Sequence, residues 1–250
     1  SQFMARFDVP GLSVAIARHG RLVYRKGFGY ADIDQRERMT EFHLFRIASI
    51  AKPVTSACVF CFIEKGVLQL SDFVFGRRGW LGFDYGKNYP DSLNSITVRH
   101  LLTHTCGGWG NGNHDPMFLN PWMSHDQLIE WVISTQPLKC TPGTCYEYSN
   151  FGYCLLGRIL EKISGRIYRE VVQESILEKC GIDSMRIAGN TLAERAGSEV
   201  VYYGKNGYSP YDMNVSRMDS HGGWIATPSD LLRFSAHVDR FNSTTDILQS

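Results

Sequence analysis

A serine and a lysine three residues apart are the first residues in this sequence whose types and spacing can do chemistry. Ser49 and Lys52 lie in segment 47–52, and residues three apart are neighbours on the surface of a helix. A serine hydroxyl needs an adjacent base to become a nucleophile, and a lysine becomes a base when burial or nearby positive charge lowers its pKa. We therefore predict Ser49 as a nucleophile activated by Lys52.

The residues around this pair decide between a catalytic and an ordinary interpretation. Ser-x-x-Lys is common by chance, and its usual meaning is a solvated helix start. Here Val54, Cys58 and Phe62 recur at helical spacing, which indicates a half-buried helix, and Pro53 fits only near a helix start. At such a start, free backbone N–H groups, including that of the serine itself, can face a developing oxyanion.

A second group with chemical potential is Tyr148-Ser149-Asn150. A tyrosine hydroxyl beside a lysine ammonium ionises more readily, because the opposite charge favours the phenolate. The amide of Asn150 offers both a donor and an acceptor to a substrate. The group follows the turn at 141–144 and precedes a predicted helix, so we expect it on a loop that can face Ser49.

Together, Ser49-x-x-Lys52 and Tyr148-x-Asn150 resemble the class C β-lactamase and penicillin-binding-protein superfamily, and in particular its animal-type, β-lactamase-like members. The resemblance extends to segments 11–15, 97–105, 142–144, 222–224 and 230–234. It implies that Ser49 is the acylated nucleophile, with Lys52 as its proton partner. It also implies that Tyr148 is general base and then acid, and that Asn150 positions the substrate.

The resemblance implies an α/β (α+β) fold, in which an antiparallel sheet flanked by helices joins a helical lobe and the active site lies at their junction. We expect one domain over residues 1–250, with 1–48 in the α/β lobe and 49–250 mainly helical. The residue pattern itself predicts a hairpin of strands 11–18 and 21–28. Helices are predicted after the caps at Thr97, Ser124 and Thr227, and over 54–65, 151–163 and 167–177.

One motif of the family has no clear counterpart. The family places Lys or His, followed by x-Gly, on a late strand beside the serine, and that strand also supplies the second oxyanion N–H. His221-Gly222-Gly223 fits the letters, but it precedes a capped helix, so we do not assign it this role. No later strand pair is visible before Ser250, and we expect the missing strands beyond residue 250 or in a C-terminal companion fragment or chain.

Composition narrows the classes of partner. With 26 Lys and Arg residues against 25 Asp and Glu, there is no basic excess to indicate nucleic acid. No apolar run approaches the roughly 18 residues that span a membrane. We expect a small-molecule or peptide substrate, and no cofactor. Trp109, in the glycine-rich loop 107–113, is a candidate substrate-binding wall, although such an aromatic can equally be an edge of the core.

Cysteines and sequons bear on the location of the protein. Seven cysteines and the sequons at Asn214 and Asn242 favour a secreted, disulfide-containing glycoprotein, with a mitochondrial or other organellar location as the alternative. Cys140 and Cys145 flank the turn before Tyr148 and can bridge there or pair elsewhere. The remaining alternative is that buried cysteines simply act as small hydrophobic residues.

Metal sites receive little support. His100 and His104 lie four residues apart, but the zincin pattern needs Glu after the first histidine, where Leu101 stands. We interpret both histidines as structural. The sequence thus predicts a serine hydrolase that cleaves an ester or a peptide-like amide bond through a Ser49 acyl-enzyme. The alternative is a binding or scaffold protein that kept the fold and lost turnover, which the missing third motif favours.

Overall fold

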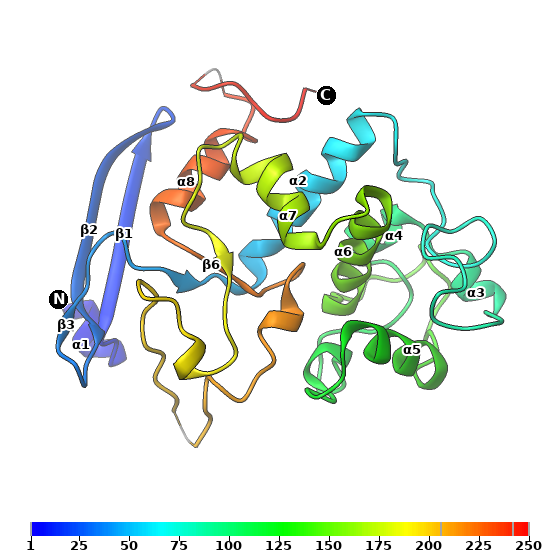
Figure 1. Ribbon diagram of the computed structural model, residues 1–250, viewed down its shortest axis with the longest axis horizontal. Coiled ribbons are helices and arrows are strands. Elements are labelled where there is room, and N and C mark those ends of the chain that lie inside the picture. The colour runs from blue at the N-terminus through cyan, green and yellow to red at the C-terminus, as the bar shows by residue number, and fades with distance from the viewer. Residues whose placement is uncertain (1, 206, 242, 250) are drawn as a thin grey trace.

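The computed structural model describes residues 2–205, 207–241 and 243–249. Figure 1 shows the elements from the N-terminal hairpin to the last helix. The strands are β1 (Gly11–Arg18), β2 (Arg21–Asp32), β3 (Glu37–Arg38), β4 (Phe45–Arg46), β5 (Arg186–Ile187) and β6 (Trp224–Ala226). The α-helices are α1 (Gln2–Phe7), α2 (Ala51–Glu64), α3 (Asp91–Asn94), α4 (Val98–Leu102), α5 (His125–Thr135), α6 (Asn150–Ser164), α7 (Tyr168–Val172) and α8 (Pro228–Ala236).

Shorter helical turns connect these elements. They are η1 (Ala48–Ile50), η2 (Pro116–Phe118), η3 (Gln173–Leu177), η4 (Leu192–Glu194) and η5 (Ser216–Met218), of which η3 is a π-helical turn that continues α7. The predicted helix 167–177 therefore exists as α7 and η3 together. Of the helices in the described residues, none combines the length and apolar character that crossing a bilayer requires.

The predicted N-terminal hairpin is confirmed. β1 and β2 pair antiparallel from Gly11 opposite Gly29 to Arg18 opposite Arg21. His19 and Gly20 form the turn with φ angles of 51° and 70°, the positive values that two-residue hairpin turns use. β3 extends this sheet beside β2, and α8 packs against β1 on one side of the hairpin (Figure 1).

A second sheet contains a later strand pair that was not visible in the sequence, while the expectation of further strands beyond residue 250 or in a companion chain stays a prediction. β4 pairs with β6, and β5 pairs with the other edge of β6. Strands of two or three residues are too short to show the alternation that reveals a strand in a sequence. The pairing continues past β4, because the Ile47 N–H donates to the Trp224 carbonyl over 3.0 Å. β6 thus fixes the chain two residues before Ser49.

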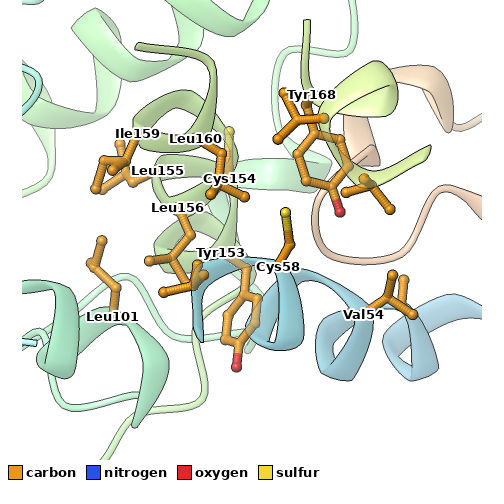
Figure 2. Close-up of a cluster of buried hydrophobic side chains, with 14 of the residues drawn as sticks. Val54, Cys58, Leu101, Tyr153, Cys154, Leu155, Leu156, Ile159, Leu160 and Tyr168 are labelled. Atoms are coloured by element: carbon orange, nitrogen blue, oxygen red, sulfur yellow. The ribbon is translucent and has the colours of Figure 1, made fainter. Parts of the chain in front are cut away.

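The main hydrophobic core includes the buried sides of α2 and α6. Figure 2 shows Cys58 of α2 facing Cys154 and Leu156 of α6. The helical spacing predicted for α2 is therefore correct, and its apolar side buries Val54 and Cys58 completely. Each fully buried aliphatic side chain of this kind contributes roughly 1.5–3 kcal/mol. This packing holds the starts of both helices, and hence the candidate site residues, against one another.

Three helices begin directly after the capping residues predicted for them. Thr97, Ser124 and Thr227 each accept a hydrogen bond from the third helical residue, and each makes a reciprocal capping box. The helix after Thr97 ends at Leu102. The early end frees His104, whose φ of 58° lies in the left-handed region, to turn away from the helix.

Candidate active site

Ser49 lies on a sharp turn between the second sheet and α2. β6 holds Ile47, and the next residue, Ala48, has a φ of 47°, a left-handed conformation that costs an alanine roughly 1–2 kcal/mol. Ser49 follows in the turn η1 and is exposed to solvent. The chain then enters α2, whose second residue is Lys52. The turn therefore presents the candidate nucleophile at the surface above a buried lysine.

Lys52 is the centre of the site. Its residue is only 4% exposed. Its Nζ donates to Ser49 Oγ over 3.1 Å, to Asn150 Oδ1 over 2.7 Å and to the His221 carbonyl over 3.0 Å. These three acceptors match the three N–H donors of an ammonium group. The predicted contact between Ser49 and Lys52 is present.

The environment of Lys52 favours loss of its proton. Burial lowers the pKa of Lys52 to about 8, although the carboxylate of Asp115 acts in the opposite direction. A neutral amine keeps two N–H bonds, which Asn150 Oδ1 and the His221 carbonyl can accept. Its lone pair is then left for the Ser49 hydroxyl, so the same geometry that solvates the ammonium can also accept a proton from the serine.

Tyr148 joins the site from the loop before α6. Its ring centre lies 4.7 Å from Lys52 Nζ and 4.3 Å from the centre of the His104 ring. Its carbonyl accepts from the Asn111 N–H over 2.8 Å. The structure thus brings Ser49, Lys52 and Tyr148 together, but the amine lies over the face of the tyrosine ring.

Asn150 begins α6 and is buried, with 7% of the residue exposed. Its Oδ1 accepts from Lys52, and its Nδ2 donates to Asp115 Oδ2 over 2.7 Å. Both ends of the amide therefore make internal hydrogen bonds, and one N–H of Nδ2 is left for another acceptor. The predicted role of Asn150 in positioning a substrate stays a prediction.

Sequence reasoning missed Asp115, whereas its interpretation of His104 and His100 as structural agrees with their hydrogen bonds. Asp115 caps the short turn η2 in a segment without periodicity, and its one sequence signal is the following proline, which marks a helical start. His104 Nδ1 accepts from the Ser149 N–H over 3.1 Å. Burial, with the nearby Lys52 charge, lowers the pKa of His104 to about 4. His104 is therefore a neutral, structural histidine, as is His100, which accepts from the Thr97 N–H.

His221 contributes to the site through its backbone. Its carbonyl accepts from Lys52, while its imidazole is buried, which lowers the pKa of His221 to about 3. Within the described part of the chain, Nε2 of this ring has no hydrogen-bond partner. At 221–223 the group that accepts the hydrogen bond from Lys52 is therefore the backbone carbonyl of His221.

Trp109, the candidate substrate-binding wall, lines a different cavity from Tyr202 and Tyr203. Trp109 is buried, donates its indole N–H to the Gln136 carbonyl and packs edge-on against Phe151. It also lines a cavity of about 500 Å³ with Glu147, the residue before Tyr148. Tyr202 and Tyr203 instead line a cavity of about 790 Å³ beside α1 and β4.

A disulfide closes the turn before Tyr148. Cys140 and Cys145 are bonded, which settles the pairing that the sequence left open. The loop also makes backbone hydrogen bonds to the segment after α4, because the Gly143 N–H donates to the Thr105 carbonyl and the Glu147 N–H to the His104 carbonyl, each over 2.8 Å. The disulfide therefore closes this turn, and the backbone hydrogen bonds hold it against the loop that carries His104.

Comparisons with known proteins identify the family of this chain. The sequence profile of the Beta-lactamase family matches residues 1–249. Penicillin-binding protein 4* of Bacillus subtilis is 32% identical over 193 residues, which cover 72% of this chain and 39% of that protein. Esterase EstB of Burkholderia gladioli is 29% identical over 205 residues, which cover 77% of this chain and 50% of that protein.

A solved structure shows the same arrangement of elements. The octameric penicillin-binding protein homologue from Pyrococcus abyssi superposes with a TM-score of 0.78 at 26% identity, covering 98% of this chain and 56% of that chain. The fold is therefore β-lactamase/transpeptidase-like, as predicted. The chain spans half or less of the length of penicillin-binding protein 4* and of esterase EstB.

Proposed function

Because this chain belongs to the beta-lactamase family, we propose that it is a serine hydrolase that cleaves an ester or amide bond through an acyl-enzyme on Ser49. One observation carries the proposal. An exposed serine hydroxyl lies 3.1 Å from a buried amine whose pKa is lowered to about 8. This pairing of nucleophile and base is the arrangement that covalent catalysis by serine requires.

In the acylation step, neutral Lys52 accepts the Ser49 proton as Oγ attacks the substrate carbonyl carbon. The new carbon–oxygen bond forms while the carbonyl π electrons move to its oxygen. Asn150 Oδ1 and the His221 carbonyl then stabilise the Lys52 ammonium that results. The tetrahedral intermediate collapses when the leaving group takes a proton and departs, which leaves the acyl group on Ser49.

Tyr148 is the proposed second proton carrier. The Lys52 amine over its ring and the His104 ring beside it support this assignment. We propose that its hydroxyl donates a proton to the leaving group, and that the phenolate so formed then accepts a proton from the water that hydrolyses the acyl-enzyme. General acid–base assistance of this kind typically contributes about 10²–10⁴ in rate.

A binding or scaffold protein without turnover has less support. A buried lysine amine is costly to maintain, because burial disfavours its charged form. A protein that only binds partners has no need for such an amine 3.1 Å from an exposed serine hydroxyl. Catalysis by Ser49 does need this amine, because the amine accepts the serine proton.

We also propose an oxidising compartment for this protein, with secretion as the route. The Cys140–Cys145 bond supports it, because disulfides persist mainly in secreted and luminal proteins. The sequon at Asn214 gives weaker support, since the amide nitrogen that would carry a glycan donates to the Pro121 carbonyl over 2.7 Å. Asn242 lies outside the described residues.

The test of the proposed function is covalent labelling. The purified chain is incubated with a fluorophosphonate probe, and peptide mass spectrometry is expected to place one adduct on Ser49. Ser49→Ala should abolish the adduct, and Lys52→Ala should slow its formation by about 10²–10⁴. Ser71→Ala, at another exposed serine, is the control and should label normally.

Undiminished labelling of Lys52→Ala would contradict the proposed activation of Ser49. Labelling at scattered serines would contradict a single nucleophile. A hydrolysis screen across nitrocefin, short-chain esters and D-amino-acid peptides then identifies the substrate class.

A further inference from the structure

Asp115 is the one buried carboxylate that touches the candidate catalytic cluster, within the described residues. The residue is 2% exposed. Its Oδ1 accepts from the Met117 N–H over 2.9 Å, and its Oδ2 accepts from Asn150 Nδ2 over 2.7 Å. Asn150 in turn accepts from Lys52. A continuous line of hydrogen bonds therefore runs from Asp115 through Asn150 and Lys52 to Ser49.

The orientation of the Asn150 amide within this line depends on the carboxylate of Asp115. An asparagine amide has an acceptor end and a donor end, and the two can exchange by rotation about the last side-chain bond. An ionised carboxylate only accepts hydrogen bonds, so Asp115 draws the NH₂ end of Asn150 towards itself. The oxygen end must then face Lys52. If the amide were reversed, its NH₂ group would confront the donors of Lys52.

We propose that Asp115 is a positioning residue for acylation of Ser49, which acts by fixing the amide of Asn150 so that its oxygen holds Lys52 in place beside the serine. The inference rests on the proposed function and goes beyond it. The side-chain hydrogen bonds of Asp115 go to the Met117 N–H and to Asn150, and not to the serine or the lysine, so its effect must pass through Asn150 or through its charge.

The charge of Asp115 gives a second readout. The groups that face Lys52 are the carboxylate of Asp115, the imidazoles of His104 and His221, and the rings of Tyr148 and Tyr153. Among them Asp115 is the negative charge, and it raises the pKa of Lys52. Loss of that charge must lower the pKa of Lys52, so the fraction of neutral amine at a given pH increases.

The experiment measures the rate of Ser49 labelling by a fluorophosphonate from pH 6 to pH 10. Four proteins are compared with the natural chain: Asp115→Ala, Asn150→Ala, the double variant of these two, and the isosteric Asp115→Asn. Asp183→Asn, at an exposed site, is the control for loss of one acidic group. Unfolding temperatures are recorded for all.

We expect Asp115→Ala to slow labelling by about 10–100-fold, the size that corresponds to one hydrogen bond to a charged group. In the Asn150→Ala background the same change should cost less than about 2-fold, because the amide that it positions is gone. In Asp115→Asn the labelling rate should begin to rise at a lower pH than in the natural chain, whereas Asp183→Asn should leave the pH profile of labelling unchanged.

Equal costs of Asp115→Ala in both backgrounds would overturn the proposal, since Asp115 would then support the fold and not the amide. An unmoved profile for Asp115→Asn would overturn the electrostatic part. If Asp115→Ala does not fold, Asp115→Asn carries the test alone. Failure of the natural chain to label at Ser49 would refute the proposed function itself and is recognised before any variant is compared.

Discussion

The amine of Lys52 lies over the ring of Tyr148, 4.7 Å from the ring centre, and so faces its π electrons. The sequence had led us to expect the amine beside the tyrosine hydroxyl. A cation over an aromatic face gains roughly 0.5–2 kcal/mol, which favours the ammonium form of Lys52 and opposes part of the effect of burial. The ring and the hydroxyl of Tyr148 therefore have separable roles.

Tyr148→Phe separates those two roles. The substitution keeps the ring over Lys52 and removes the hydroxyl, so we expect turnover to fall by about 10²–10⁴ with an unchanged unfolding temperature. Steady-state hydrolysis and calorimetry measure the two quantities. Tyr146→Phe, at an exposed neighbour, is the matched control. If Tyr148→Phe turned over at the rate of the natural chain, the hydroxyl would have no catalytic role and Tyr148 would contribute only packing.

The pH dependence of acylation should report Lys52. Below a pKa of about 8 the amine is protonated and cannot accept the Ser49 proton, so the labelling rate should rise with pH through about 8 and then level off. Lys52→Arg keeps the positive charge, but a guanidinium does not deprotonate. We expect this variant to label about 10²–10⁴ more slowly, while Lys65→Arg should behave as the natural chain. A rate independent of pH from 6 to 10 would exclude Lys52 as the base.

His104 should make the fold sensitive to acid. Its pKa is about 4 in the folded chain against about 6.5 in an unfolded one, so the unfolded state binds more protons between these values. The free energy of unfolding should therefore fall as pH drops from 6.5 to 4, by on the order of 2–3 kcal/mol from this group. His221, lowered in the same direction, adds to the effect.

His104→Asn tests this prediction. Asparagine tolerates the φ of 58° at this position and can accept the Ser149 N–H, but it carries no titrating ring. Urea unfolding at pH 7 and pH 4.5 should show a smaller loss of stability for the variant than for the natural chain. The control is His19→Asn, at an exposed histidine with a φ of 51°. Equal losses in all three proteins would contradict the assignment.

The disulfide should stabilise the turn before Tyr148. Replacing both Cys140 and Cys145 by serine opens a short loop, for which chain entropy predicts a loss of about 2 kcal/mol. Because this turn is bonded to the loop of His104, we expect slower Ser49 labelling as well. A reductant should bring the unfolding temperature of the natural chain down to that of the double variant and leave the variant unchanged. No effect on either quantity would show that the hydrogen bonds alone hold the turn.

Local patterns alone predicted the elements that depend on nearby residues. The hairpin of strands 11–18 and 21–28, the capping boxes of Thr97, Ser124 and Thr227, and the buried side of α2 all follow from neighbours within a few positions. The pairing of β4, β5 and β6 could not be predicted, because such short strands gain their stability from partners far away in the chain.

The sequence by itself determined which kinds of reactive residue are present and that Ser49 contacts Lys52, since a spacing of three residues at a helix start fixes that contact locally. Only the tertiary structure decided what surrounds the amine. Asn150 and His221 come from separate segments and each accepts a hydrogen bond from Lys52, while Asp115, from a third segment, accepts one from Asn150. Burial and fixed hydrogen bonds depend on that long-range packing, and they convert an ordinary lysine into a base.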